Sequence, residues 1–193
     1  MKPFIQTFLP HENLPENIVL PQQVHGTRIV EIVTGEEDLL ACDGMFLLSS
    51  NSSSNLKLGI RTADCAPICF WTPEKIGILH AGWRGLVDGI VETMLKNMET
   101  PGRLPGADLE IHVGPLLPQF EIQRDHCFYK IQERFGDAFF REKYGMLFFD
   151  FHAALRSIIP NATFDPRSTY LTPDLASWRR DRDERRNVTI ISL

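Results

Sequence analysis

The 193-residue sequence lacks an excess of positive charge and carries a formal net charge of −5. Proteins that bind nucleic acid usually need a basic surface, because Lys and Arg replace the counterions around phosphates. The densest arginine run, at residues 179–186, is interleaved with Asp181, Asp183 and Glu184 and nearly neutralises itself. We therefore expect a solvated loop at this run and no nucleic-acid partner.

Long hydrophobic runs are also absent, since none reaches the roughly 18 residues that a membrane-spanning helix needs. Residues 1–10 show no charged segment followed by an apolar one, which a secretory signal would require. Only four cysteines occur, namely Cys42, Cys65, Cys69 and Cys127. We expect a cytoplasmic protein with no membrane partner, whose cysteines are thiols, metal ligands or core residues rather than disulfides. Cys42, Cys69 and Cys127 are expected in the core.

No internal repeat, heptad pattern or linker interrupts the chain. Apolar residues make up 43% of it, which is enough for one well-filled core and indicates a single domain over residues 1–193. The Ser-Asn stretch at residues 49–55 is the one low-complexity segment, and we expect a flexible turn between strands there.

Hydrophobic periodicity predicts strands and helices in mixed order. Leu86, Ile90, Met94 and Met98 recur at spacings of four and predict an amphipathic helix over residues 86–98. Several strands follow one another in hairpin-like succession, so the expected fold is a layered α/β sandwich with a mixed β-sheet. The other predicted elements are strands at 27–33, 45–48, 56–60, 66–71, 75–79, 109–113 and 188–193, and helices at 124–135 and 149–159.

Three segments combine a reactive side chain with a sharply bending backbone: residues 22–26, 61–67 and 80–85. In each, a His or Cys lies at or near the end of a predicted strand, where α/β proteins usually place their sites. Two imidazoles and one thiolate suit zinc and leave a fourth position open for water or substrate. The spacing meets no compact zinc-binding pattern, so by itself it leaves open that each residue belongs to the core or surface.

These segments resemble the multicopper polyphenol oxidoreductase, or laccase-domain, family of YfiH-like proteins, which are also described as purine nucleoside phosphorylases. The family's Gln-Val-His-Gly, Thr-Ala-Asp-Cys-x-Pro and His-Ala-Gly-Trp-Arg-Gly segments are intact at residues 23–26, 62–67 and 80–85. Weaker likenesses continue at residues 42–45, 113–122 and 175–181. The resemblance implies a YfiH-like layered α/β fold in which His25, Cys65 and His80 hold one catalytic zinc.

The chain also departs from the family pattern. Members usually begin with a longer segment containing an Arg-His/Gly-Gly-x-Ser motif, whereas residues 1–22 here contain none. We expect a domain that is N-terminally short relative to the family, with substrate groups from that segment missing or replaced. Ser168-Thr169 stands where the family usually has Cys-Thr.

The reaction implied by the resemblance is phosphorolysis of a purine nucleoside such as adenosine, inosine or methylthioadenosine. Arg84, at the predicted start of the helix after His80, is the candidate for holding the phosphate. Deamination of adenosine, also attributed to the family, needs an activated water and a nearby acid or base. Asp64 is the candidate for that role, and a turn residue that caps local N–H groups is its equally open alternative.

There are three alternative functions, and the sequence argues against the first of them. Copper-dependent oxidation of phenols needs several copper centres, which six histidines do not supply. A Cys-His hydrolase would use Cys65 as nucleophile and His80 or His25 as base. A non-catalytic metal-binding protein would keep the metal without the reaction. Metal content separates the hydrolase from the zinc enzyme.

Overall fold

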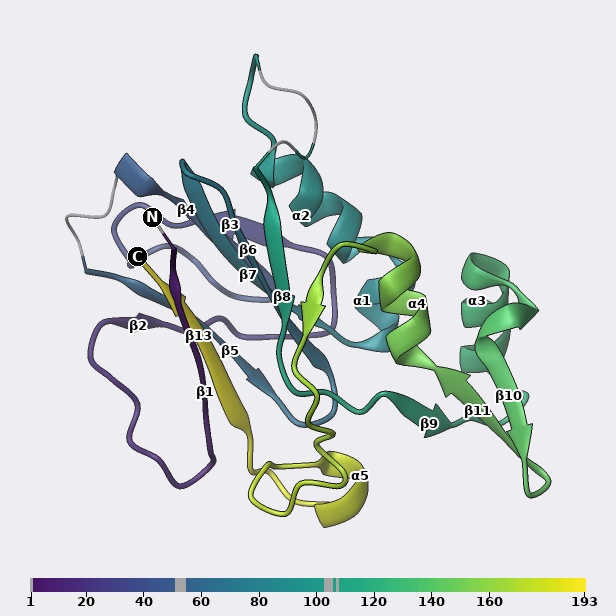
Figure 1. Cartoon of the computed structure of the whole chain (residues 1–193). Coiled ribbons are helices and arrows are strands. Elements are labelled where there is room, and N and C mark those ends of the chain that lie inside the picture. The colour runs from purple at the N-terminus through teal and green to yellow at the C-terminus, as the bar shows by residue number, and fades with distance from the viewer. Residues whose placement is uncertain (1, 51–54, 103–105, 107) are drawn as a thin grey trace.

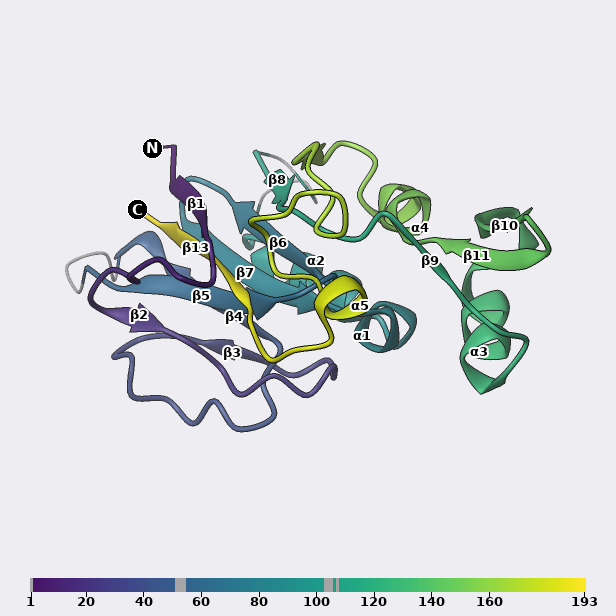
Figure 2. The same ribbon diagram turned by 90° about the horizontal axis from the view of Figure 1, so that it is seen from below.

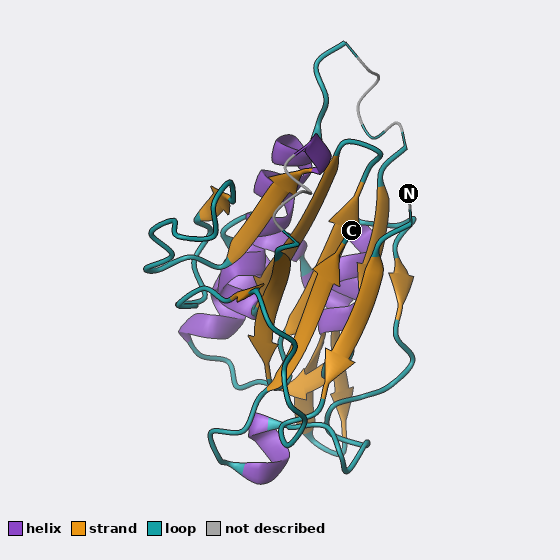
Figure 3. Ribbon diagram, turned by 90° about the vertical axis from the view of Figure 1, so that its left-hand side faces the viewer, coloured by secondary structure: helices purple, strands orange, loops and turns teal. Residues whose placement is uncertain are grey.

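A computed structural model describes residues 2–50, 55–102, 106 and 108–193, and these residues form three layers. A four-stranded sheet packs on one face of a six-stranded sheet, and helices cover the other face (Figures 1 and 3). The expected layered α/β sandwich is therefore confirmed.

The six-stranded sheet is the central layer. Its outer pairs β12–β8 and β3–β4 are parallel and its inner pairs are antiparallel, so the sheet is mixed as predicted. All six residues of β6 are buried, which is the pattern of a strand covered on both faces. In sheet order the strands are β12 (Thr163–Phe164), β8 (Glu110–Val113), β6 (Ala66–Trp71), β7 (Lys75–Ala81), β4 (Gly44–Leu48) and β3 (Ile29–Glu31).

The four-stranded sheet joins the two ends of the chain. The outer strand β1 pairs antiparallel with β13, with Phe4 opposite Ser192, so the N- and C-terminal strands lie side by side (Figure 1). Strand β5 passes directly into β6 of the other sheet, and residues 63–65 make this crossing. In sheet order the strands are β1 (Phe4–Phe8), β13 (Asn187–Ser192), β5 (Lys57–Thr62) and β2 (Ile18–Val19).

Helices α1, α2 and α4 lie against the six-stranded sheet, and a small sheet with α3 extends from it as an arm (Figures 1 and 2). The helices are α1 (Trp83–Val87), α2 (Ile90–Met98), α3 (His126–Phe135), α4 (Phe151–Ile158) and α5 (Trp178–Asp181), with a short 3-10 helix η2 at Asp137–Phe139. The arm's strands, in sheet order, are β10 (Phe140–Lys143), β11 (Met146–Asp150) and β9 (Gln119–Glu121). Within the described residues, no helix has the length and apolar character that crossing a bilayer requires.

Two hydrophobic clusters fill the spaces between the layers. Along β6, Ile68 and Phe70 pack toward the helices, whereas Cys69 and Trp71 pack toward the four-stranded sheet. This alternation follows from the two-residue period of a strand. Cys42 and Cys69 are fully buried, as predicted, and Cys127 is only partly buried at the start of α3.

The predicted helix over residues 86–98 is wrong as a single element. The helical stretch begins earlier, at Trp83, and is divided into α1 and α2 by Asp88 and Gly89. Gly89 has a φ of 86°, a left-handed conformation that a continuous helix does not contain. The predicted apolar face is correct, because Leu86, Ile90, Met94 and Met98 are all buried.

Other predicted boundaries also shift. The strand expected at 27–33 is limited to Ile29–Glu31. The helix expected at 149–159 begins at Phe151, because residues 149–150 belong to β11, and the Asp150 carboxylate accepts a hydrogen bond from the Ala153 N–H as the N-cap. Of the turn expected at 49–55, residues 51–54 lie outside the described residues.

Candidate metal centre

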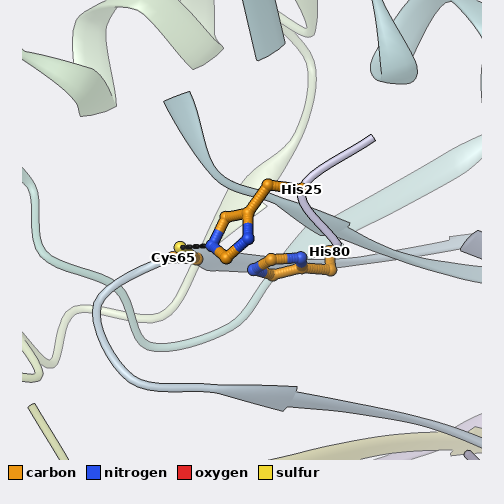
Figure 4. Close-up of side chains that lie close together, drawn as sticks. All are labelled: His25, Cys65 and His80. Atoms are coloured by element: carbon orange, nitrogen blue, oxygen red, sulfur yellow. Dashed lines mark hydrogen bonds between the residues drawn. The ribbon is translucent and has the colours of Figure 1, made fainter. Parts of the chain in front are cut away.

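The three predicted ligands come from three separate segments and meet at one end of the central sheet (Figure 4). His25 lies in the loop between β2 and β3, Cys65 ends the crossing from β5 to β6, and His80 lies near the end of β7. Because β6 and β7 are antiparallel, with Ala66 opposite Ala81, Cys65 lies beside the end of β7. One potential ligand atom from each residue lies within 4.8 Å of the others.

The cluster has dimensions that suit a tetrahedral cation. The Nε2 atom of His25 is 3.8 Å from the Sγ atom of Cys65, and the two imidazole rings are 4.7 Å apart between centres. Zinc bonds of about 2.3 Å to sulfur and 2.0–2.1 Å to nitrogen would place two tetrahedral ligands about 3.6 Å apart. The residues present therefore fit a zinc ion with three protein ligands.

Asp43 anchors two of these segments, and this role was not predicted from the sequence. Its carboxylate is fully buried and accepts hydrogen bonds from the backbone N–H groups of Val24, His25 and Gly26, at 2.7–3.1 Å. It also lies 2.8 Å from Nδ1 of His80. An Nδ1–H that donates to this carboxylate leaves Nε2 of His80 available to a cation, which is the usual outer partner of a metal-binding histidine.

The local charges favour deprotonated sulfur. Burial raises the pKa of the Cys65 thiol, but hydrogen bonds and charge from His25 and His80 outweigh burial and lower this pKa to about 6. For His80, burial lowers the pKa, whereas Asp43 and Cys65 raise it to about 9 overall. Without a metal, Cys65 and His80 thus form a thiolate–imidazolium pair at neutral pH. A cation that binds there displaces the His80 proton, because metal ligands must be deprotonated.

Close packing explains the glycines of the third segment. A Cβ atom on Gly82 would lie 2.7 Å from Cδ2 of His25 and 3.2 Å from Sγ of Cys65. One on Gly85 would lie 2.9 Å from the carbonyl oxygen of Gly26. Both glycines therefore let the start of α1 approach the loop that carries His25.

The His25–Cys65–His80 cluster forms part of the wall of a cavity of about 570 Å³, within the range of small-molecule sites. Aromatic and basic side chains make up much of the remaining lining, to which Asp64 adds one carboxylate. Four aromatic residues, Trp83, Phe120, Phe151 and Trp178, line the cavity together with Arg61, Arg179 and Arg186.

Asp64 lies in the crossing next to Cys65, in a left-handed conformation with a φ of 87°. Its carboxylate accepts hydrogen bonds from the Thr169 hydroxyl at 2.7 Å and from the Arg179 N–H at 2.8 Å. Both oxygens thus tie the Cys65 turn to the C-terminal segment. Its role as an acid or base stays a prediction.

Arg84 is exposed, and its guanidinium lies 5.1 Å from the centre of the Trp83 ring. Arg84 is not among the described residues that line the cavity, and its role in holding phosphate stays a prediction. Of the solvated loop expected at 179–186, residues 179–181 belong to α5, and the exposed Arg179 and the half-buried Arg186 also line the cavity. A tryptophan at position 178, directly before this run, was the sequence signal for a binding surface.

Arg180 has a different role in the same run. Its guanidinium is paired with the carboxylate of Asp181 and donates to backbone carbonyls of the preceding loop. It therefore holds that loop against α5 and leaves its neighbour Arg179 at the cavity. The carbonyl acceptors belong to Thr169, Tyr170, Thr172, Pro173 and Leu175.

Comparison with known proteins places these features in context. The sequence model of the family described as multi-copper polyphenol oxidoreductase laccase matches residues 6–193. A relative named purine nucleoside phosphorylase, from Aquifex aeolicus (strain VF5), is 30% identical over 186 residues, covering 92% of this chain and 84% of that protein. The crystal structure of the hypothetical protein YfiH from Bacillus licheniformis is 24% identical with a TM-score of 0.77, covering 92% of this chain and 74% of that one. The structure of YlmD from Geobacillus stearothermophilus is 22% identical with a TM-score of 0.75, covering 92% and 73%.

Proposed function

The chain belongs to the family described as multi-copper polyphenol oxidoreductase laccase, and we propose that within it the chain acts as a zinc-dependent purine nucleoside phosphorylase. We further propose that residues 1–193 work as one catalytic domain. A reducing, cytoplasmic compartment suits a site that depends on the Cys65 thiolate.

One observation supports the proposal most strongly: the His25–Cys65–His80 cluster and a set of aromatic and arginine side chains face the same cavity. Aromatic faces bind purine bases by stacking, and Trp83 and Trp178 are the largest such surfaces here. Guanidinium groups bind phosphate through paired N–H donors. A nucleoside and a phosphate are thus the pair of ligands that this lining suits.

In the proposed reaction, a phosphate oxygen bonds to C1′ of the ribose as the bond from C1′ to the base nitrogen breaks. The electron pair of the broken bond goes to the base, which takes up the proton that the phosphate loses. When bound, zinc would supply a Lewis acid at this wall of the cavity. Asp43 keeps His25 and His80 oriented, and the aromatic side chains hold the base and exclude water.

Oxidation of phenols by copper is the alternative that the family's description suggests. Two histidines and a cysteine also occur in blue-copper sites, where a weak axial methionine is typical. Among the described residues, no methionine lines the cavity, and His25, Cys65 and His80 form the one cluster suited to a metal. A multicopper centre needs more histidines than this region contains, so zinc is the better match.

The experiment compares adenosine, inosine and methylthioadenosine, with and without phosphate, on zinc-loaded protein and on its Cys65→Ala variant. We expect free base and ribose 1-phosphate (or its methylthio analogue) only with phosphate, and no product from the variant. Inosine formed from adenosine, without free base, would indicate deamination instead. Product formation by protein that holds no zinc would favour a Cys-His hydrolase. A folded, zinc-loaded protein that turns over none of these nucleosides would refute the proposal and leave a metal-binding protein.

A further inference from the structure

We propose that phosphate binds to an anion subsite formed by Arg61, Arg179 and Arg186, called here the arginine wall. This inference rests on the proposed function for the identity of the anion, whereas the binding site itself follows from the cavity. It replaces Arg84, the position that the sequence pattern suggested, with residues from β5 and the C-terminal segment.

Arg179 is the central member of the arginine wall. Its guanidinium lies over the Phe120 ring, 4.7 Å from the ring centre, which holds one planar face of the group against the cavity lining. Within the described residues, no hydrogen-bond acceptor is paired with its side-chain N–H groups. These donors are therefore available to a ligand, and their fork geometry matches two oxygens of a phosphate.

Arg61 and Arg186 line the same cavity as Arg179. The side-chain amide of Gln23 bonds to both the N–H and the carbonyl of Arg61, at 2.9 and 2.7 Å, and fixes this end of β5. Arg186 lies over the Trp178 ring and donates only to backbone carbonyls. In the described residues, no carboxylate forms an ion pair with any of the three arginines.

Within residues 179–186, two arginines outside the cavity do form ion pairs with carboxylates. Arg180 pairs with Asp181, and Arg185 pairs with Asp181 and Asp183, and neither lines the cavity. The acidic side chains of this segment therefore neutralise Arg180 and Arg185. Asp64 and Glu121 attract the Arg179 guanidinium without forming an ion pair with it, so the arginines at the cavity keep side-chain donors for an anion.

A hydrogen bond connects the arginine wall to the segment that carries Cys65. The Asp64 carboxylate accepts the Arg179 N–H at 2.8 Å, and Asp64 directly precedes Cys65. The backbone of Arg179 is thus held beside the turn that carries a metal ligand. A phosphate on the wall would lie in the same cavity as a nucleoside placed between the aromatic faces, as the reaction needs.

The test is a calorimetric titration of zinc-loaded protein with inorganic phosphate, without nucleoside. Because Arg179 would donate charge-assisted hydrogen bonds to phosphate, Arg179→Gln should raise the phosphate dissociation constant about tenfold or more. Arg61→Gln should also raise it, and it remains informative if Arg179→Gln fails to fold. Arg185→Gln, from the same run but outside the cavity, is the matched control and should change it little. Zinc content should stay the same in all three variants.

The subsite is refuted if wild-type protein binds no phosphate, if Arg179→Gln and Arg61→Gln bind it like wild type, or if Arg185→Gln weakens binding equally. Nucleoside assays separate this failure from that of the proposed function. Phosphate binding that depends on Arg179, without any phosphorolysis, would leave the subsite standing and refute the function. Phosphorolysis with an unchanged phosphate KM in both cavity variants would support the function and refute the subsite.

Discussion

Replacing Asp43 by Asn should disable the metal centre without changing the size of the side chain. The carboxylate accepts hydrogen bonds with both oxygens: one faces the N–H groups of Val24 and Gly26, and the other faces the N–H of His25 and Nδ1 of His80. An amide has only one acceptor oxygen. In one orientation its NH2 group faces the N–H groups of Val24 and Gly26, and in the other it faces His25 and His80.

The expected loss of stability and of zinc affinity follows from the loss of one acceptor oxygen. The first orientation leaves two backbone donors without an acceptor, at about 1–3 kcal/mol each, or about 2–6 kcal/mol together. In the second orientation the NH2 group donates to Nδ1 of His80, which moves the ring proton to Nε2 and blocks that nitrogen as a ligand. Loss of such an outer partner typically lowers metal affinity about 10–100-fold. A typical domain is stable by about 5–15 kcal/mol, so the fold should survive in weakened form.

Two measurements check this prediction. Urea unfolding of the metal-free protein reports the lost backbone hydrogen bonds, and competition with a chelator reports the zinc affinity. Asp88→Asn, at an exposed position after α1, is the control and should alter neither. If Asp43→Asn binds zinc as tightly as wild type and unfolds at the same urea concentration, Asp43 does not anchor the site and the reasoning is wrong.

Three further results are expected. Cys65→Ala should abolish the binding of about one zinc per chain, whereas Cys127→Ala should retain it in elemental analysis. Gly82→Ala should lower zinc affinity, because its Cβ would lie 2.7 Å from His25, whereas Gly26→Ala should have little effect since its nearest contacts are at 3.5 Å; equal affinities would contradict the packing argument. In metal-free protein, alkylation of Cys65 by iodoacetamide should slow as the pH falls through about 6, because the lowered thiol pKa keeps the thiolate down to that pH. A midpoint near the ordinary cysteine pKa of about 8.5 would show that the histidines do not stabilise the thiolate.

The fold could be predicted in outline because local patterns and burial agree along most of the chain. The segments 66–71 and 76–79 are apolar throughout, and in the structure they are buried on both faces. The division of the predicted helix over 86–98 was missed because Asp88-Gly89 interrupts the backbone and not the apolar spacing. In the arm, the helix at 126–135 was predicted, but the strands β9, β10 and β11 were missed because they depend on pairing with one another, which periodicity does not reveal.

The sequence by itself determined which residues make a metal site plausible, since His25, Cys65 and His80 lie in three short segments whose chemistry and likeness to a known family can be read directly. Only the tertiary structure decided what surrounds them. Asp43 acquires its role because it precedes β4 where the loop at residues 24–26 and the end of β7 both lie within hydrogen-bond distance, and Arg179 reaches the cavity because Asp64 holds its backbone across a separation of 115 residues. Such contacts depend on how the strands pair and cross between sheets. The local sequence around Asp43 or Arg179 does not distinguish an anchoring carboxylate or a binding arginine from a solvated one.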